Sequence, residues 1–214
     1  MLTRNTLAAV AIVAAALASG CASKKGYQKS EYLADEVTAC VASIDAYGIH
    51  RQASFESMNA LVAEPLENLP AKFETFDKSV QRVVSADAAL RESIVSMKAS
   101  AAVRFQNWGE ENVSYSDNEM QVRSQQRRAE AAETFRRASV DAEAMLVQSA
   151  SFVSYLSDLR KILSNDLSDK GVAGVADFAA KARVSNGHLD EMARPTRTSL
   201  GAAAEAMSSK NETN

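Results

Sequence analysis

The fold of this chain is decided by residues 71–108, which read AKFETFDKSVQRVVSADAALRESIVSMKASAAVRFQNW. Hydrophobic side chains recur there at alternating steps of three and four residues, and Asp87 takes the position of the series between Val83 and Leu90. A sustained pattern of this kind predicts a long helix that buries one narrow stripe against partner helices. The stripe consists of Phe73, Phe76, Val80, Val83, Leu90, Ile94, Met97, Ala101, Phe105 and Trp108.

The composition of the chain favours helix throughout. Its 214 residues suffice for one domain with a hydrophobic core, and they include only 8 glycines and 3 prolines, the residues that break helices. We find no run of alternating β-branched and aromatic residues bounded by turns, the pattern that would predict a strand. The small net charge of -3 favours neither a nucleic-acid partner nor a disordered acidic chain.

Similar stripes flank the central helix on both sides. The first helix begins at Ser30 and is loosened or broken at Gly48. The third helix begins at a capping box. The Ser116 hydroxyl accepts a hydrogen bond from the backbone N–H of Glu119, and the Glu119 side chain accepts one from the backbone N–H of Ser116. A shorter fourth helix is interrupted at Pro195, because proline lacks the backbone N–H that a helix interior needs.

These helices define the predicted fold class, which is all-α. Short connections make consecutive helices antiparallel neighbours, so we expect an elongated up-down bundle or coiled coil of three long helices plus a shorter fourth. An open rod that completes its core by oligomerising satisfies the same pattern. The predicted organisation is a signal peptide (1–20), a lipidated cysteine and tether (21–29), the helical domain (30–207) and a disordered tail (208–214).

The N-terminal segment has the features of a bacterial lipoprotein signal. Arg4 supplies the positive charge, and residues 7–17 form an apolar segment too short to span a bilayer comfortably. The sequence Leu-Ala-Ser-Gly-Cys at 17–21 resembles a lipobox, which implies that Cys21 becomes the acylated N-terminus of the mature protein. The alternative is an ordinary signal peptide that leaves Cys21 as a free thiol.

A lipidated Cys21 has consequences for compartment and for the second cysteine. Residue 22 is alanine and not the aspartate that often marks inner-membrane retention, so we expect palmitate-type acyl chains in the outer membrane, with the domain facing the periplasm. Cys40 then has no intrachain partner. It is either a small core residue, since Val37 and Ile44 share its helical face, or half of an intermolecular disulfide.

Asp87 is the polar residue that least fits its surroundings. One interpretation is that the stripe drifts locally, so that Val84 or Ala88 faces inward in its place. The other interpretation is a buried polar residue that fixes the register of the helices at a cost in stability.

Two surfaces are candidate binding sites. A basic segment of the third helix is either a solvated face paired with Glu130 and Glu133 or a dock for anionic lipid headgroups or cell-wall polymer. Its residues are Arg123, Arg127, Arg128, Arg136 and Arg137. Phe105, Trp108 and Tyr115 gather at one end of the second helix, as either the packed end of the bundle or a pocket for an apolar ligand.

The sequence contains no pattern that predicts catalysis. Metal sites in helical bundles use a glutamate three residues before a histidine, but Tyr47 precedes His50 and Ser185 precedes His188 at that spacing. Phosphate-binding loops, nucleophile elbows and paired-cysteine motifs are absent from the sequence. We therefore expect a non-enzymatic protein with no catalytic residues, metal ligands or cofactor.

Three short motifs resemble a family of bacterial lipoproteins with a domain of unknown function, DUF2959. They are Phe-Gln-Asn-Trp-Gly-Glu-Glu at 105–111, Arg-Ser at 123–124, and Ser-Asn-Asp-Leu at 164–167 followed by Gly-Val at 171–172. The resemblance covers mainly residues 30–207. It implies a secreted, mostly helical, coiled-coil protein, and it supplies no activity.

Together these observations predict a membrane-tethered helical scaffold or docking protein of the cell envelope, with an envelope protein or cell-wall partner. Two alternatives remain open. One is a carrier that holds an apolar ligand within the bundle near Trp108. The other is a homo-oligomeric structural spacer.

Overall fold

The computed structural model describes residues 25–63, 66–112 and 115–208, and these residues are almost entirely helical, with no strand among them. The helices are α2 (Gly26–Val62), α3 (Leu69–Asn112), α4 (Asn118–Asn165), α5 (Asp169–Gly174) and α6 (Ala176–Met207). The predicted all-α class is confirmed. The expected signal peptide, Cys21 and residues 209–214 of the expected tail lie outside the described residues.

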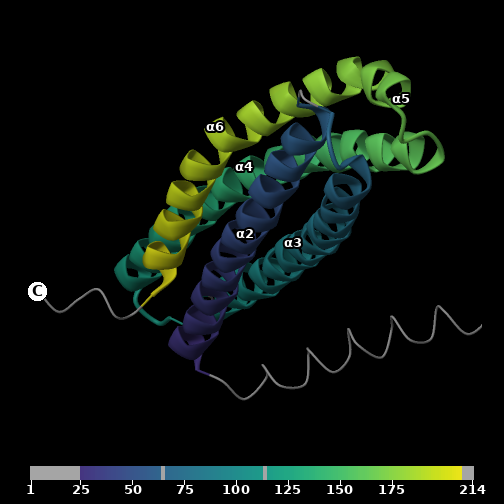
Figure 1. The fold of residues 1–214 in the computed structure, drawn as a ribbon. Helices are drawn as coiled ribbons and strands as arrows, with labels where there is room; N and C mark the ends of the chain where they lie inside the picture. Colours follow the sequence, from purple (N-terminus) through teal and green to yellow (C-terminus); the bar gives the residue numbers. More distant parts are fainter. Residues whose placement is uncertain (1–24, 64–65, 113–114, 209–214) are drawn as a thin grey trace, which may run out of the picture.

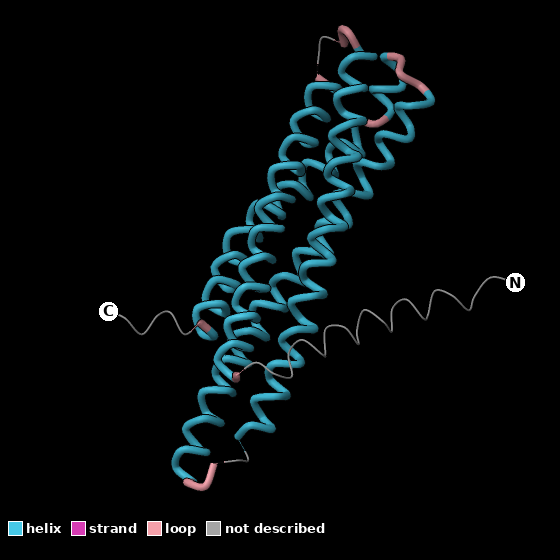
Figure 2. Tube along the Cα trace, turned by 90° about the horizontal axis from the view of Figure 1, so that it is seen from below, coloured by secondary structure: helices cyan, strands magenta, loops and turns pink. Residues whose placement is uncertain are grey.

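The four long helices form an elongated up-down bundle (Figures 1 and 2). Helix α2 packs against α3 and α6, and α4 packs against the same two helices, which closes a ring of four. The short α5 joins the ends of α4 and α6. The predicted up-down bundle is confirmed, and its first helix begins at Gly26, four residues before the predicted start at Ser30.

The core follows the predicted stripe along the whole rod. Residues of α3 from Phe76 to Ala101 that belong to the stripe are buried, and those at its two ends are partly buried. Matching stripes of the other helices meet it, with Leu33 and Met58 from α2 and Leu156 from α4 among the fully buried side chains. Removal of this apolar surface from water is the main stabilising term of the fold.

Two predicted irregularities are absent from the described helices. Helix α6 continues through Pro195, and α2 continues through Gly48. Pro195 lies on the exposed face of α6, and Thr196 and Leu200 on the buried face hold the helix against its neighbours. Tertiary packing therefore outweighs the loss of one backbone hydrogen bond at the proline, and the predicted interruption is wrong.

The start of α4 differs from the prediction by one residue. Asp117 and not Ser116 is the N-cap, and its Oδ1 accepts hydrogen bonds from the backbone N–H groups of Glu119 at 2.8 Å and Met120 at 3.0 Å. A carboxylate suits this position because it accepts both donors and carries the negative charge that a helix N-terminus favours. The predicted capping box is therefore wrong. Ser168 caps α5, where its hydroxyl accepts a hydrogen bond from the backbone N–H of Gly171 at 3.2 Å.

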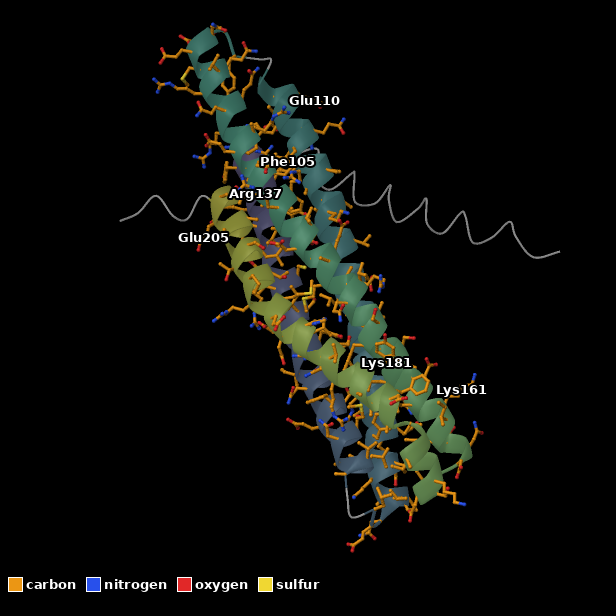
Figure 3. The ribbon with its side chains drawn as sticks, turned by 90° about the horizontal axis from the view of Figure 1, so that it is seen from above. Phe105, Glu110, Arg137, Lys161, Lys181 and Glu205 are labelled. Carbon is orange, nitrogen blue, oxygen red and sulfur yellow. The ribbon has the colours of Figure 1, made fainter. Side chains whose placement is uncertain are left out.

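The helices do not end at the same level. Glu205, near the end of α6, lies beside Arg137 of α4, whereas Glu110 of α3 lies further along the rod (Figure 3). Residues 118–130 of α4 extend past the end of α6, and the structure buries none of their side chains fully. We call residues 105–112 and 115–131 the hairpin end, because α3 and α4 project there beyond the rest of the bundle (Figure 2).

Candidate functional site

A layer of polar side chains crosses the middle of the apolar core. We call it the polar layer, and it consists of Tyr47 and Arg51 from α2, Asp87 from α3, Ser149 from α4 and Asn186 from α6. All five side chains are buried, so each of the four long helices contributes to it.

Asp87 is the centre of the polar layer. It is 9% exposed, whereas Val84 is 41% exposed, so the stripe does not drift and Asp87 itself faces inward. Its Oδ1 accepts a 2.5 Å hydrogen bond from the Ser149 hydroxyl, and its Oδ2 lies 3.5 Å from the guanidinium of Arg91. The carboxylate is thus held between α3 and α4 by a hydrogen bond and a weak ion pair.

The Tyr47 hydroxyl is buried next to this carboxylate. Burial, together with the negative charge of Asp87, raises the pKa of Tyr47 above its ordinary value. The hydroxyl has no hydrogen-bond partner among the residues that the structure describes. A buried hydroxyl without a partner costs free energy, so the polar layer carries a stability penalty that an apolar core would not.

Arg51 joins α2 to α6 at the edge of the polar layer. Its guanidinium is almost wholly buried and donates to the backbone carbonyl of Asn186 at 3.0 Å, to the Asn186 side-chain oxygen, and to the carboxylate of Asp190. The carboxylate of Asp190 is more than half exposed. The guanidinium of Arg51 therefore holds α2 against one turn of α6, while the carboxylate of Asp190 stays in contact with water.

The arrangement of the polar layer suits it to fixing how the four helices align. The polar groups meet only when the four helices have one relative axial position, so sliding α3 against α4 would separate Ser149 from Asp87 in an apolar core. This is the arrangement by which a buried polar residue specifies register in helical assemblies.

The predicted aromatic end is a set of packed and hydrogen-bonded side chains. The rings of Phe105 and Phe135 lie 5.9 Å apart at 60°, which joins α3 to α4. The indole N–H of Trp108 donates to Ser124 at 3.3 Å. Tyr115 is exposed, whereas Phe105 and Trp108 are partly buried.

Arg104, which the sequence analysis did not single out, organises this end of the rod. Its guanidinium covers the Trp108 ring at 4.5 Å, donates to the Ser30 hydroxyl at 2.8 Å and lies 3.5 Å from Glu111. Burial lowers the pKa of Arg104, and the charge of Glu111 opposes this effect. Lys29 adds a second ion pair to Glu111 at 3.1 Å. These contacts fasten the first turn of α2 to the end of α3.

The five arginines of the predicted basic face are engaged in several ways along α4. Arg123 pairs with Glu119 at 2.5 Å, and Arg128 donates to the Phe105 carbonyl at 3.3 Å. Arg136 and Arg137 share Glu133, and their hydrogen bonds lower the pKa of that glutamate to about 2. The fifth, Arg127, lies on the exposed surface of the same helix. The negative charges of Glu119 and Glu133 thus offset much of the positive charge of this face.

Cys40 and the two histidines occupy different environments. Cys40 is fully buried and free, and burial raises the pKa of its thiol to about 11. His50 is half-buried beside Ala46 and Lys78, and His188 is exposed. Among residues 25–63, 66–112 and 115–208, no three His, Cys, Asp or Glu side chains lie close enough to hold a metal ion.

None of the described helices is both long enough and apolar enough to cross a membrane. The fold and its polar layer define an elongated, four-helix protein whose apolar core is crossed by buried hydrogen bonds. The chain belongs to the family described as "Protein of unknown function (DUF2959)", which matches residues 20–177. The match includes α2 to α5 and ends at the start of α6. No curated protein and no solved structure matches the chain.

Proposed function

We propose that this protein is a non-enzymatic lipoprotein of the bacterial cell envelope. Cys21 would tether it to the outer membrane, and its rod would serve as a periplasmic scaffold that docks an envelope protein or a cell-wall partner. The lipobox at 17–21 supports the anchor. The mutual engagement of Asp87 with Ser149 and of Arg51 with Asn186 supports a structural role for the buried polar groups.

The observation that carries the proposal is where the rod begins. Helix α2 starts at Gly26, five residues after Cys21, and Arg104 and Glu111 hold its first turn to α3. A rod fixed so near its anchor has a defined attached end. At about 1.5 Å per residue, the 37 residues of α2 carry the opposite end about 55 Å away.

The first test concerns the anchor. Mass spectrometry of the N-terminal peptide from the envelope fraction should find acyl groups on Cys21, and the Cys21→Ala variant should lack them. An unmodified mature peptide from the parent protein would overturn the lipoprotein assignment.

The second test concerns the partner. A photo-crosslinking residue at exposed Arg137, and another at exposed Lys170 on α5, would each be activated in living cells before mass spectrometry. Recovery of one envelope protein or a cell-wall fragment supports docking. Recovery of the protein crosslinked only to itself would replace docking by a self-assembling spacer, and the absence of any adduct from either position would overturn it.

A further inference from the structure

We infer that the hairpin end rests on the phospholipid surface of the leaflet that holds the Cys21 acyl chains. The inference rests on the proposed lipidation of Cys21. It adds a direct contact between the folded domain and the bilayer, made by the exposed residues Tyr115, Met120 and Val122 at the tip of the rod.

The first argument is the level at which α2 begins. Ser30 of α2 is bonded to Arg104, and Lys29 to Glu111, so the first turn of α2 lies beside the last turns of α3. Trp108 is bonded in turn to Ser124 of α4. Helix α4 begins at Asn118, and it therefore continues past the start of α2 by three to six residues, or roughly 5–9 Å.

The second argument is the reach of the tether. Four residue steps separate Cys21 from Lys25, and an extended chain spans at most about 3.5 Å per step, which gives about 14 Å. The hairpin end projects on the same side of the bundle as the start of α2 (Figures 2 and 3). A bilayer that holds Cys21 at the end of so short a tether is within reach of the tip of α4.

The third argument is the distribution of exposed hydrophobic residues. Tyr115, Met120 and Val122 are 45%, 56% and 53% exposed and fall within eight residues at the tip. Other exposed hydrophobic side chains, such as Val95 and Val147, are spaced along the sides of the rod. Scattered valines are ordinary on a protein surface, whereas tyrosine and aliphatic residues at one extremity suit the interface between headgroups and acyl chains.

The charges at the tip identify the kind of surface. Asp117 and Glu119 lie there, and Glu119 pairs with Arg123, so the tip has no excess of positive charge. Attraction to anionic lipid would need such an excess. The contact is therefore with zwitterionic headgroups, and it depends on apolar insertion and on the tether, with little dependence on salt.

The test uses the lipidated full-length protein in phosphatidylcholine vesicles. An environment-sensitive fluorophore is attached at Met120→Cys on the tip, Val147→Cys on the side, or Lys170→Cys at the opposite end. Cys40 is fully buried, and the parent protein is the control for labelling there. Vesicles containing a phospholipid with a nitroxide on its headgroup should quench the label at residue 120 at least twofold more than the labels at 147 and 170.

A second variant tests the apolar contact itself. With the label moved to Tyr115→Cys, Val122→Asp should remove more than half of the quenching while flotation with vesicles is unchanged. Protein that floats with no quenching at residue 120 would overturn the inference and leave the anchor intact. Equal quenching at residues 120 and 147 would mean that the rod lies flat, which also overturns it. Failure to float, with no acyl group on Cys21, would overturn the anchor as well.

Discussion

The Ser149 hydroxyl and the Asp87 carboxylate meet at 2.5 Å in the middle of a core that is otherwise mostly apolar. The bond joins α4 to α3, and the Leu146 carbonyl of the same helix as Ser149 lies 2.9 Å from that hydroxyl, as an alternative acceptor for its single hydrogen. The serine therefore keeps a partner when Asp87 is replaced, whereas the carboxylate depends on Ser149 and the half-exposed Arg91 to offset its burial. This asymmetry makes Asp87 the residue to change.

Replacement of Asp87 by leucine should raise stability. The substitution removes a buried carboxylate and adds apolar contacts, and such exchanges in cores are often stabilising by about 1 kcal/mol or more. For a chain of this size, about 1 kcal/mol corresponds to a rise in Tm of roughly 2–4 °C. Differential scanning calorimetry checks the prediction, with Asp87→Asn as the variant that keeps the shape. An unchanged or lower Tm for Asp87→Leu would contradict it.

Removal of Arg51 should lower the stability of the protein more than removal of its acidic partner, Asp190. Arg51→Ala removes the guanidinium that donates to the buried Asn186 side-chain oxygen and opens space in the interior, so we expect the free energy of unfolding to fall by about 2–4 kcal/mol. Asp190→Asn should cost less than about 1 kcal/mol, because that carboxylate is largely solvated. Urea denaturation of both variants measures the difference. Equal losses would show that the ion pair, and not the buried guanidinium, holds α6.

Cys40 should be inert in the folded protein. In the Cys21→Ser variant it is the sole thiol, and a thiol reagent at pH 8 should react in urea but not under native conditions. Rapid reaction of the folded protein would contradict the observed burial and would favour the alternative of an intermolecular disulfide.

The Cys40 thiol should also make the stability of the protein depend on pH. Its pKa is about 11 in the folded protein and about 9 as the ordinary value, so the folded state holds the proton more tightly. Its contribution to stability is complete below pH 9 and is lost as the pH rises from 9 through 11. Cys40→Ala should flatten the fall of Tm over that window. An identical fall in both proteins would contradict the assignment.

Two glycines should respond to alanine in opposite directions. A Cβ at Gly171 would lie 2.2 Å from the backbone oxygen of Asp166, so Gly171→Ala should destabilise the turn between α4 and α5 by about 1–3 kcal/mol. A Cβ at Gly187 would meet no atom within 4 Å, so Gly187→Ala in α6 should stabilise by up to about 1 kcal/mol. Thermal unfolding of the pair checks both signs, and a shared sign would refute the local explanation.

The stripe in residues 71–108 could be predicted because its cause is local. Burial of one face of a helix imposes the spacing of Val80, Val83 and Leu90, whatever the partner helices are. The exact start of the helix was harder to predict, since α3 begins at Leu69, before the first residue of that stretch. Asn68, with a φ of 55°, precedes it in the left-handed region that asparagine tolerates, and its carbonyl accepts the N–H groups of Ala71 and Lys72.

The polar layer was only partly accessible from sequence. Asp87 stood out because it interrupts the stripe, and the alternative that it is buried is confirmed. Arg51 follows Tyr47 by four residues, and Asn186 precedes Leu189 by three, so both occupy stripe positions that sequence reasoning passed over. Their meeting depends on how four helices align along the rod. One helix's periodicity does not contain that information.

The environments of the aromatic end and the basic face could not be predicted fully either, because they also depend on contacts between helices. Arg104 is buried because it lies on Trp108 and meets Ser30 and Glu111. Trp108 and Glu111 are close to it in the chain, whereas Ser30 belongs to another helix. The docking role of the basic face and the lipidation of Cys21 stay predictions. Continuation of α6 through Pro195 could not be predicted, because a rule about one residue does not include the packing around it.

The contacts between the start of α2 and the end of α3 also affect how the rod would respond to a mechanical load. A pull on the chain N-terminal to Lys25, directed away from the bundle, acts along the axis of α2. It loads the Ser30–Arg104 and Lys29–Glu111 contacts first and then the whole α2–α3 interface in shear. Many side-chain contacts resist shear together, whereas peeling would break them one at a time. An axial pull at the N-terminal end would therefore be opposed by the α2–α3 contacts acting together.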